Sequence, residues 1–174
     1  MFEKICNHAA MMVLGVFVGA VVAAAWMGVG QGSLVQATAT HGESNFAIAT
    51  GPADNAIEAF YFLDFLTGDM KAAVLQPRLG KFNSFFTYNI LNDFKVQGQK
   101  NPKYLMVTGT AELPRGSGSS QIGASLIYVA EATTGQVCAY ALPFSSSLNN
   151  AGKPQRDSLR LIASGTFRTT AVRD

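Results

Sequence analysis

Two stretches of the chain decide its fold: Phe60–Leu75, FYFLDFLTGDMKAAVL, and Ile127–Leu142, IYVAEATTGQVCAYAL. They align without a gap and are identical at five of 16 positions, namely Tyr61/Tyr128, Thr67/Thr134, Gly68/Gly135, Ala72/Ala139 and Leu75/Leu142. In each copy, two runs rich in aromatic and β-branched residues flank an acidic residue that is followed, after two residues, by Thr-Gly. Such runs favour strands, and glycine readily takes the positive φ of a tight turn. Each copy therefore predicts a β-hairpin.

The polar residues of the predicted turns allow two interpretations. They are Asp64, Thr67 and Gly68 in the first copy, and Glu131, Thr134 and Gly135 in the second. An acidic side chain before a turn can accept hydrogen bonds from turn amides, which would be repeated because the hairpin is repeated. Alternatively, Asp64 and Glu131 could serve acid–base chemistry or bind a cation. The turn-capping interpretation is favoured.

A shorter motif accompanies each hairpin. FAIATG (46–51), YLMVTG (104–109) and RLIASG (160–165) each end an apolar run with a small residue, Thr or Ser, and then Gly. We therefore expect repeat units at 46–75 and 104–142, each with a strand and a hairpin, and a final strand at 159–167. The predicted fold class is mainly β (α+β), an antiparallel domain with an internal repeat and one packed helix.

The predicted helix covers about residues 83–95, between the units. Phe82, Phe86 and Ile90 are four residues apart, Asn83 or Ser84 could cap the helix, and Gly98 could end it. The aromatic density fits an apolar helix face packed on the sheet. The alternative is an aromatic ligand surface, formed by Phe82, Phe85, Phe86 and Tyr88.

The long motif, Y-h-x-[DE]-x-x-T-G-x-h-x-A-x-x-L, resembles strand pairs from β-propeller blades of the quinoprotein and YVTN types. There too an acidic residue precedes a Thr-Gly turn, and the likeness covers about a fifth of this chain. A closed propeller needs at least four blades, whereas this chain has two units and a fraction. The blade Trp signature and the quinoprotein cofactor residues are missing, so the resemblance implies no cofactor. The chain as a whole is similar to bacterial cell-envelope proteins of unknown function.

Residues 9–29 predict a transmembrane helix. This run, AAMMVLGVFVGAVVAAAWMGV, has no charged residue and is long enough to cross a hydrocarbon core of roughly 30 Å. Lys4 precedes it and no basic residue follows until Lys71, which places residues 1–8 in the cytoplasm and the C-terminal domain outside, at a bacterial inner membrane. Residues 30–45 are expected to be a linker, and 46–174 the extracytoplasmic domain.

Two questions about this segment stay open. An uncleaved signal anchor is favoured, because the apolar run is longer than a usual signal peptide core; cleavage after Ala37 would give a secreted or periplasmic protein. Gly15, Gly19 and Ala23 recur every four residues, a spacing that lets membrane helices pack closely. Alternatively, the helix is simply rich in alanine.

Cysteines and histidines limit the chemistry of the outer domain. Cys6 and Cys138 would lie on opposite sides of the membrane, so no internal disulfide is expected. The histidines are His8 and His41, which leaves no imidazole from residue 42 onward for Ser-His-Asp or Cys-His catalysis. We therefore predict no catalytic, metal or cofactor site.

The overall charge gives no reason to expect nucleic acid as a partner. The 174 residues include 13 Lys and Arg against 11 Asp and Glu, with 48% hydrophobic and 14% charged residues. We expect a membrane-anchored structural or interaction protein that is a subunit or accessory of an envelope complex, with protein partners or as a homo-oligomer. A ligand-binding module and, less favoured, a carboxylate-only hydrolase are the alternatives.

Overall fold

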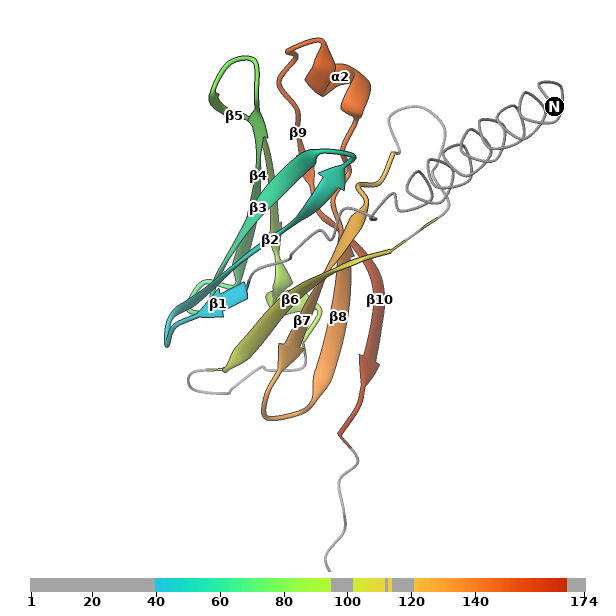
Figure 1. Cartoon of the computed structure of the whole chain (residues 1–174). Coiled ribbons are helices and arrows are strands. Elements are labelled where there is room, and N and C mark those ends of the chain that lie inside the picture. The colour runs from blue at the N-terminus through green and yellow to red at the C-terminus, as the bar shows by residue number, and fades with distance from the viewer. Residues whose placement is uncertain (1–39, 95–101, 112, 114–120, 169–174) are drawn as a thin grey trace, which may run out of the picture. The chain divides into compact units, whose positions relative to one another are not determined.

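A computed structural model describes residues 40–94, 102–111, 113 and 121–168 of the chain. The described part is mainly β and forms a single compact unit (Figure 1). In chain order its elements are β1 (Thr40–Gly42), β2 (Phe46–Asp54), β3 (Ile57–Asp64), β4 (Asp69–Gln76), β5 (Lys81–Asn89), the 3-10 helix η1 (Ile90–Asn92), β6 (Tyr104–Thr110), β7 (Ser125–Glu131), β8 (Gln136–Ala141), α2 (Ser146–Asn150), β9 (Arg156–Ser158) and β10 (Arg160–Thr166).

The strands form two sheets that face each other. The six-stranded sheet has the order β1-β2-β3-β4-β5-β9, and the four-stranded sheet has the order β10-β8-β7-β6. Every neighbouring pair is antiparallel except β5 and β9. The predicted repeat appears as two three-stranded units, β2-β3-β4 in one sheet and β6-β7-β8 in the other. Both predicted hairpins and the predicted final strand are present.

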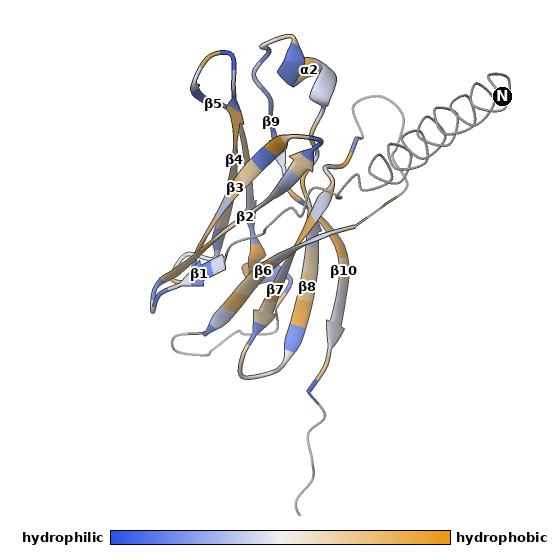
Figure 2. Ribbon diagram, in the orientation of Figure 1, coloured by the Kyte–Doolittle hydropathy of each residue, from blue (hydrophilic) through white to orange (hydrophobic). Residues whose placement is uncertain are grey.

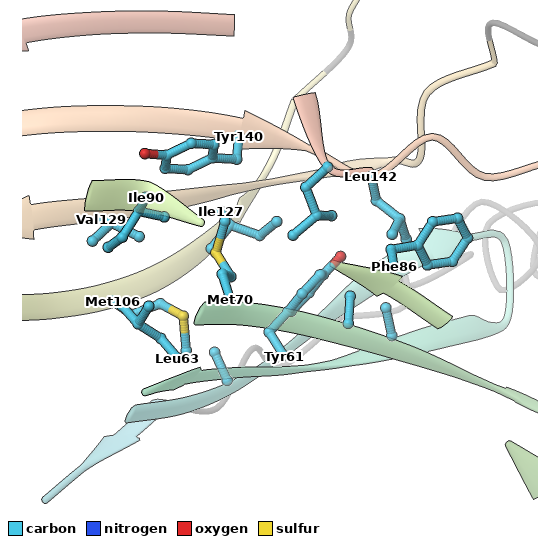
Figure 3. Packing of buried hydrophobic residues seen from close by; sticks show 14 of the residues in the cluster. Tyr61, Leu63, Met70, Phe86, Ile90, Met106, Ile127, Val129, Tyr140 and Leu142 are labelled. Carbon is cyan, nitrogen blue, oxygen red and sulfur yellow. The ribbon is translucent and has the colours of Figure 1, made fainter. Parts of the chain in front are cut away.

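The core lies between the two sheets. Tyr61, Leu63, Met70 and Phe86 of the six-stranded sheet point toward side chains of β6, β7 and β8 (Figure 3). Those partners are Met106, Ile127, Val129 and Tyr140. Burial raises the pKa of Tyr61 to about 12, and its hydroxyl lies 3.4 Å from the Ser125 Oγ across the core. This contact satisfies a polar group at the centre of an apolar layer.

The chain links the sheets along both sides. Leu159 is the buried corner between β9 in one sheet and β10 in the other, and its amide donates to the Thr87 carbonyl at 3.3 Å. On the other side, the Thr108 hydroxyl donates to the Thr50 carbonyl, and the Ala124 amide donates to the Ala53 carbonyl at 3.0 Å. These two hydrogen bonds join β2 of the six-stranded sheet to β6 and to the residue before β7 of the four-stranded sheet.

The Asp93 carboxylate connects the segment after β5 to the opposite sheet by hydrogen bonds. The Asp93 carboxylate accepts hydrogen bonds from the Tyr88 hydroxyl at 3.3 Å and from the Tyr140 hydroxyl at 2.9 Å. The Gln136 side chain donates to the Asp93 carbonyl at 2.6 Å. Since Tyr140 and Gln136 belong to β8, this cluster ties the two sheets together beyond the apolar core.

The helix predicted at 83–95 is wrong. Residues 81–89 form β5, followed only by the single turn of η1 at 90–92. The four-residue spacing of Phe82, Phe86 and Ile90 fits a two-residue period as well as a helical one, and β5 buries Ser84 and Phe86 alternately with exposed neighbours. Among the described residues the α-helix is α2, whose first turn is capped by the Ser145 hydroxyl.

The boundary of the predicted linker is also shifted. Thr40–Gly42, assigned to the linker, forms β1 and pairs with β2. Backbone pairing of an edge strand needs no apolar side-chain pattern, so a small polar sequence concealed it. The predicted span at 9–29, with Gly15, Gly19 and Ala23, lies outside the described residues. Within those residues no helix is long and apolar enough to cross a membrane.

Substitution of the hairpin glycines by alanine should destabilise the fold to different extents. Gly68, Gly80 and Gly135 all have positive φ, which costs an alanine about 1–2 kcal/mol. A Cβ at Gly80 would meet no atom within 4 Å, whereas one at Gly135 would lie 2.4 Å from the Arg168 Cβ and 2.9 Å from its backbone nitrogen. Chemical denaturation should therefore show a clearly larger loss for Gly135→Ala than for Gly80→Ala. Equal losses would contradict the close approach of Arg168 to this turn.

Candidate functional site

The first hairpin turn is capped by its own acidic residue. The Asp64 Oδ1 accepts hydrogen bonds from the amides of Leu66 at 2.8 Å and Thr67 at 3.1 Å. The Thr67 hydroxyl accepts from the Asp69 amide at 3.3 Å, and Gly68 holds φ +69°. The amides of Thr67 and Leu66 hold the pKa of the Asp64 carboxyl below its usual value.

The second turn repeats this arrangement in a buried setting. The Glu131 Oε1 accepts from the Thr133 amide at 2.9 Å, and its Oε2 accepts from the Thr134 amide at 2.6 Å and the Thr134 hydroxyl at 2.7 Å. Gly135 also has φ +69°. Burial opposes ionisation of Glu131, but the hydrogen bonds from Thr134 and Thr133 outweigh it, and the pKa is lowered.

These geometries support capping over acid–base chemistry. Both oxygens of the Glu131 carboxylate are occupied by the turn, and the residue is fully buried. Asp64 caps a turn in the other sheet. Within the described ranges, no group of three or more His, Cys, Asp or Glu side chains could hold a metal ion. The two carboxylates therefore hold the hairpins in shape, each in its own sheet.

The outer face of the four-stranded sheet is almost free of charge. Its cross-strand rows are Leu105–Ala130–Val137–Gly165, Val107–Tyr128–Ala139–Ala163 and Gly109–Leu126–Ala141–Arg160. Ala111, Leu113 and Ile122 pack on the last row and part of the second. The rest is open, with Leu105 65% and Val107 52% exposed. The solvent side of an antiparallel sheet is ordinarily polar, so a face on which Arg160 is the one charged residue among these rows is unusual.

The β10 strand borders this face and leaves one edge unpaired. Among the described residues it pairs with β8 on one side only, and its residues from Leu161 to Thr166 are all exposed. It contains no Pro, and no charged residue after Arg160. Charges and Pro are common protections of strand edges, and here only the bulge between Leu161 and Ala163 is present. The edge is therefore available to another strand.

The outer face of the six-stranded sheet carries aromatic rings in two neighbouring rows. One row is Thr50–Phe60–Ala73–Phe85–Arg156, and the next is Ile48–Phe62–Lys71–Thr87–Ser158. Phe60 and Phe62 are half-buried, and Phe85 is 40% exposed. Apolar residues therefore occur on the strands of both sheets beyond what the core requires (Figure 2).

Two of these rings are each covered on the side away from β4. The Arg156 guanidinium, on β9, lies 5.4 Å from the centroid of the Phe85 ring. Phe46, on β2, stacks on Phe62 with centroids 5.4 Å apart and ring planes at 19°. Because β4 lies between β3 and β5, the Phe62 and Phe85 rings flank β4 from its two neighbouring strands.

A polar hollow adjoins these rings. It has a volume of about 430 Å³ and is lined by residues 69–71 of β4, residues 87–89 of β5, and Ser158 of β9. The Asp69 Oδ1 accepts from the Asn89 Nδ2 at 2.9 Å. Within the described part of the chain, the Asp69 Oδ2, the Lys71 ammonium and the Thr87 hydroxyl make no hydrogen bond or ion pair. The hollow therefore offers donors and acceptors beside aromatic faces.

The structure divides the predicted aromatic surface between two environments. Phe85 and, beyond a register shift in β5, Phe82 are exposed, whereas Phe86 is buried in the core and Tyr88 packs against it. The exposed Phe85 ring joins Phe60 and Phe62, which the sequence analysis did not assign to any surface. The alternation of Phe60 and Phe62 with Tyr61 and Leu63 indicates that these two rings lie on the outer face of β3. Because residues 83–95 were predicted to be helical, Phe85 was not expected on the same sheet face.

The two capped turns should respond differently to loss of charge. Asp64 uses one oxygen for both amides, so Asp64→Asn can keep both hydrogen bonds; Glu131 uses both oxygens, so Glu131→Gln must lose an acceptor in a buried site. Chemical denaturation at pH 7 should show a loss of about 1–3 kcal/mol for Glu131→Gln and a smaller loss for Asp64→Asn.

The pH dependence of stability provides a second measurement. Folding lowers both carboxyl pKa values, so each ionised group stabilises the fold above the ordinary carboxyl pKa. That stabilisation disappears as the pH falls through the lowered values. The acid-induced loss should be smaller in Glu131→Gln than in the parent chain, and an unchanged acid profile would argue against the assigned role.

Comparison with family models, with curated proteins and with solved structures finds no match to this chain.

Proposed function

We propose that the protein is a structural or interaction protein that acts by contact with other proteins through the outer face of its four-stranded sheet. The observation that carries this proposal is the set of rows on β6, β7, β8 and β10, which is apolar apart from Arg160 and lies next to the open β10 edge. Large exposed apolar patches generally mark interaction sites, and an exposed edge can add a partner strand. Contact with another protein through this face would bury both the apolar patch and the exposed β10 edge.

The membrane part of the proposal is supported by the sequence. An anchor at residues 9–29 would hold the β domain outside the cytoplasmic membrane, where it could serve as a subunit or accessory of an envelope complex. The acidic residues of both turns are engaged in capping, which favours a contact role over a hydrolytic one.

A ligand-binding role is the second candidate, favoured by the polar hollow on the six-stranded sheet. The two roles are compatible, because the two outer faces lie on opposite sides of the core.

The contact proposal can be tested with one charge on the four-stranded face. Val107→Lys places an ammonium in the middle row of this face, and we expect at least a several-fold loss of crosslinked partner or oligomer in native membranes. Leu66→Lys is the matched control, since Leu66 is 84% exposed in a turn away from this face. Crosslinking followed by mass spectrometry, and native mass in mild detergent, measure both.

The outcomes separate clearly. Loss of the partner in Val107→Lys, with retention in Leu66→Lys, supports the four-stranded face as the contact surface. A parent chain that is strictly monomeric without partners, or a partner that both variants retain equally, would overturn the proposal.

A further inference from the structure

The outer face of the six-stranded sheet has a chemistry different from that of the other face. It combines aromatic rings with a hollow that contains both hydrogen-bond donors and hydrogen-bond acceptors. From this combination we propose that the face binds a glycan, a chain of β-linked pyranose sugars, lying along β4. This site is separate from the contact surface of the four-stranded sheet.

The apolar contribution comes from rings placed on either side of β4. Phe60 and Phe62 stand on β3 and Phe85 stands on β5, about 9.5 Å from one strand to the other. Between Phe60 and Phe85 lies Ala73, the smallest side chain available apart from glycine. A sugar ring that contacts an aromatic ring on each side needs about 7–8 Å between the two aromatic rings, since each contact distance is about 3.5–4 Å. The separation of the two strands therefore matches the width of a flat ring lying over Ala73.

The rings are also held in place before a ligand arrives. Arg156 covers one face of Phe85, and Phe46 covers one face of Phe62. These contacts restrict the motion of the two rings. A ligand that stacks on them loses less side-chain entropy on binding than it would with mobile rings.

The polar contribution lies at the neighbouring end of β4. The hollow presents the Lys71 ammonium as a donor, the Asp69 Oδ2 as an acceptor, and the Thr87 hydroxyl as either. A pyranose ring shows C–H groups on its faces and hydroxyls around its rim. Stacking on aromatic faces with donors and acceptors at the rim matches both parts of such a ring.

Charge favours an uncharged ligand over a polyanion. Lys71 and Arg156 are offset on this face by the carboxylates of Asp69 in the hollow and of Glu58 and Asp64 on β3. A nucleic acid would place phosphates next to Asp69, and an apolar protein surface would leave the polar groups of the hollow without partners. The extended shape of the β4 row, from Asp69 past Ala73, fits several sugar units in line.

The test uses the full-length protein in lauryl dimethylamine oxide, a detergent without a sugar headgroup. Isothermal titration calorimetry measures binding of chitohexaose and cellohexaose, two β-1,4-linked probes, with α-linked dextran oligosaccharide as a comparison. We expect at least one β-linked probe to bind, and Phe85→Thr and Thr87→Val each to weaken it about tenfold, a loss of about 1.4 kcal/mol. Both replacements are β-branched and suit a strand.

Matched controls come from residues elsewhere on the chain. Phe167→Thr removes a ring that is 79% exposed, and Thr110→Val removes an exposed hydroxyl from β6; neither should change binding. Absence of binding to both β-linked probes at millimolar concentration would overturn the proposal. Binding that survives Phe85→Thr and Thr87→Val would overturn it too. Either failure would leave the crosslinking result for the four-stranded face unaffected.

Discussion

The alternation of side chains along each strand is the constraint on which the rest of this structure depends. In β3, placing Tyr61 and Leu63 in the core necessarily turns Phe60 and Phe62 to the other side. The same rule in β5 buries Ser84 and Phe86 and exposes Phe85. Because pairing registers then align these outward residues across β3, β4 and β5, the core sequence also determines the composition of the outer face. The surface of the six-stranded sheet is thus a consequence of its packing.

The repeated turns fix that register. Each turn uses an acidic residue to hold its amides and a glycine to reverse the chain, and each glycine carbonyl receives an amide from a distant segment. The Gly68 carbonyl accepts from Ile90 at 2.9 Å, and the Gly135 carbonyl accepts from Phe167 at 2.9 Å. A slip of one residue would move every core side chain to the solvent side. The turns therefore protect both the core and the two outer faces from misalignment.

The hairpins could be predicted from local sequence, because the turn residues and the alternation of apolar side chains both lie within 16 residues. Local patterns also predicted the repeat and the final strand. They could not predict how residues far apart in sequence combine, such as Phe62 with Lys71 and Thr87, since that depends on the register of three strands. The predicted helix at 83–95 failed for a related reason. A spacing of four residues is compatible with both the helical period and the two-residue period of a strand. Residues 81–89 form a strand because β4 and β9 pair with β5 along its two edges.

The edges of the two sheets differ in a way that bears on function. Both edges of the six-stranded sheet end in three-residue strands, β1 and β9, and very short edge strands resist further pairing. The four-stranded sheet ends in β10, with seven residues and exposed Leu161 and Ile162. Among the described residues, the edges of the sheet with the polar hollow are therefore better protected than the β10 edge of the sheet with the apolar face. This asymmetry favours strand pairing and protein contact on one side of the core and ligand contact on the other.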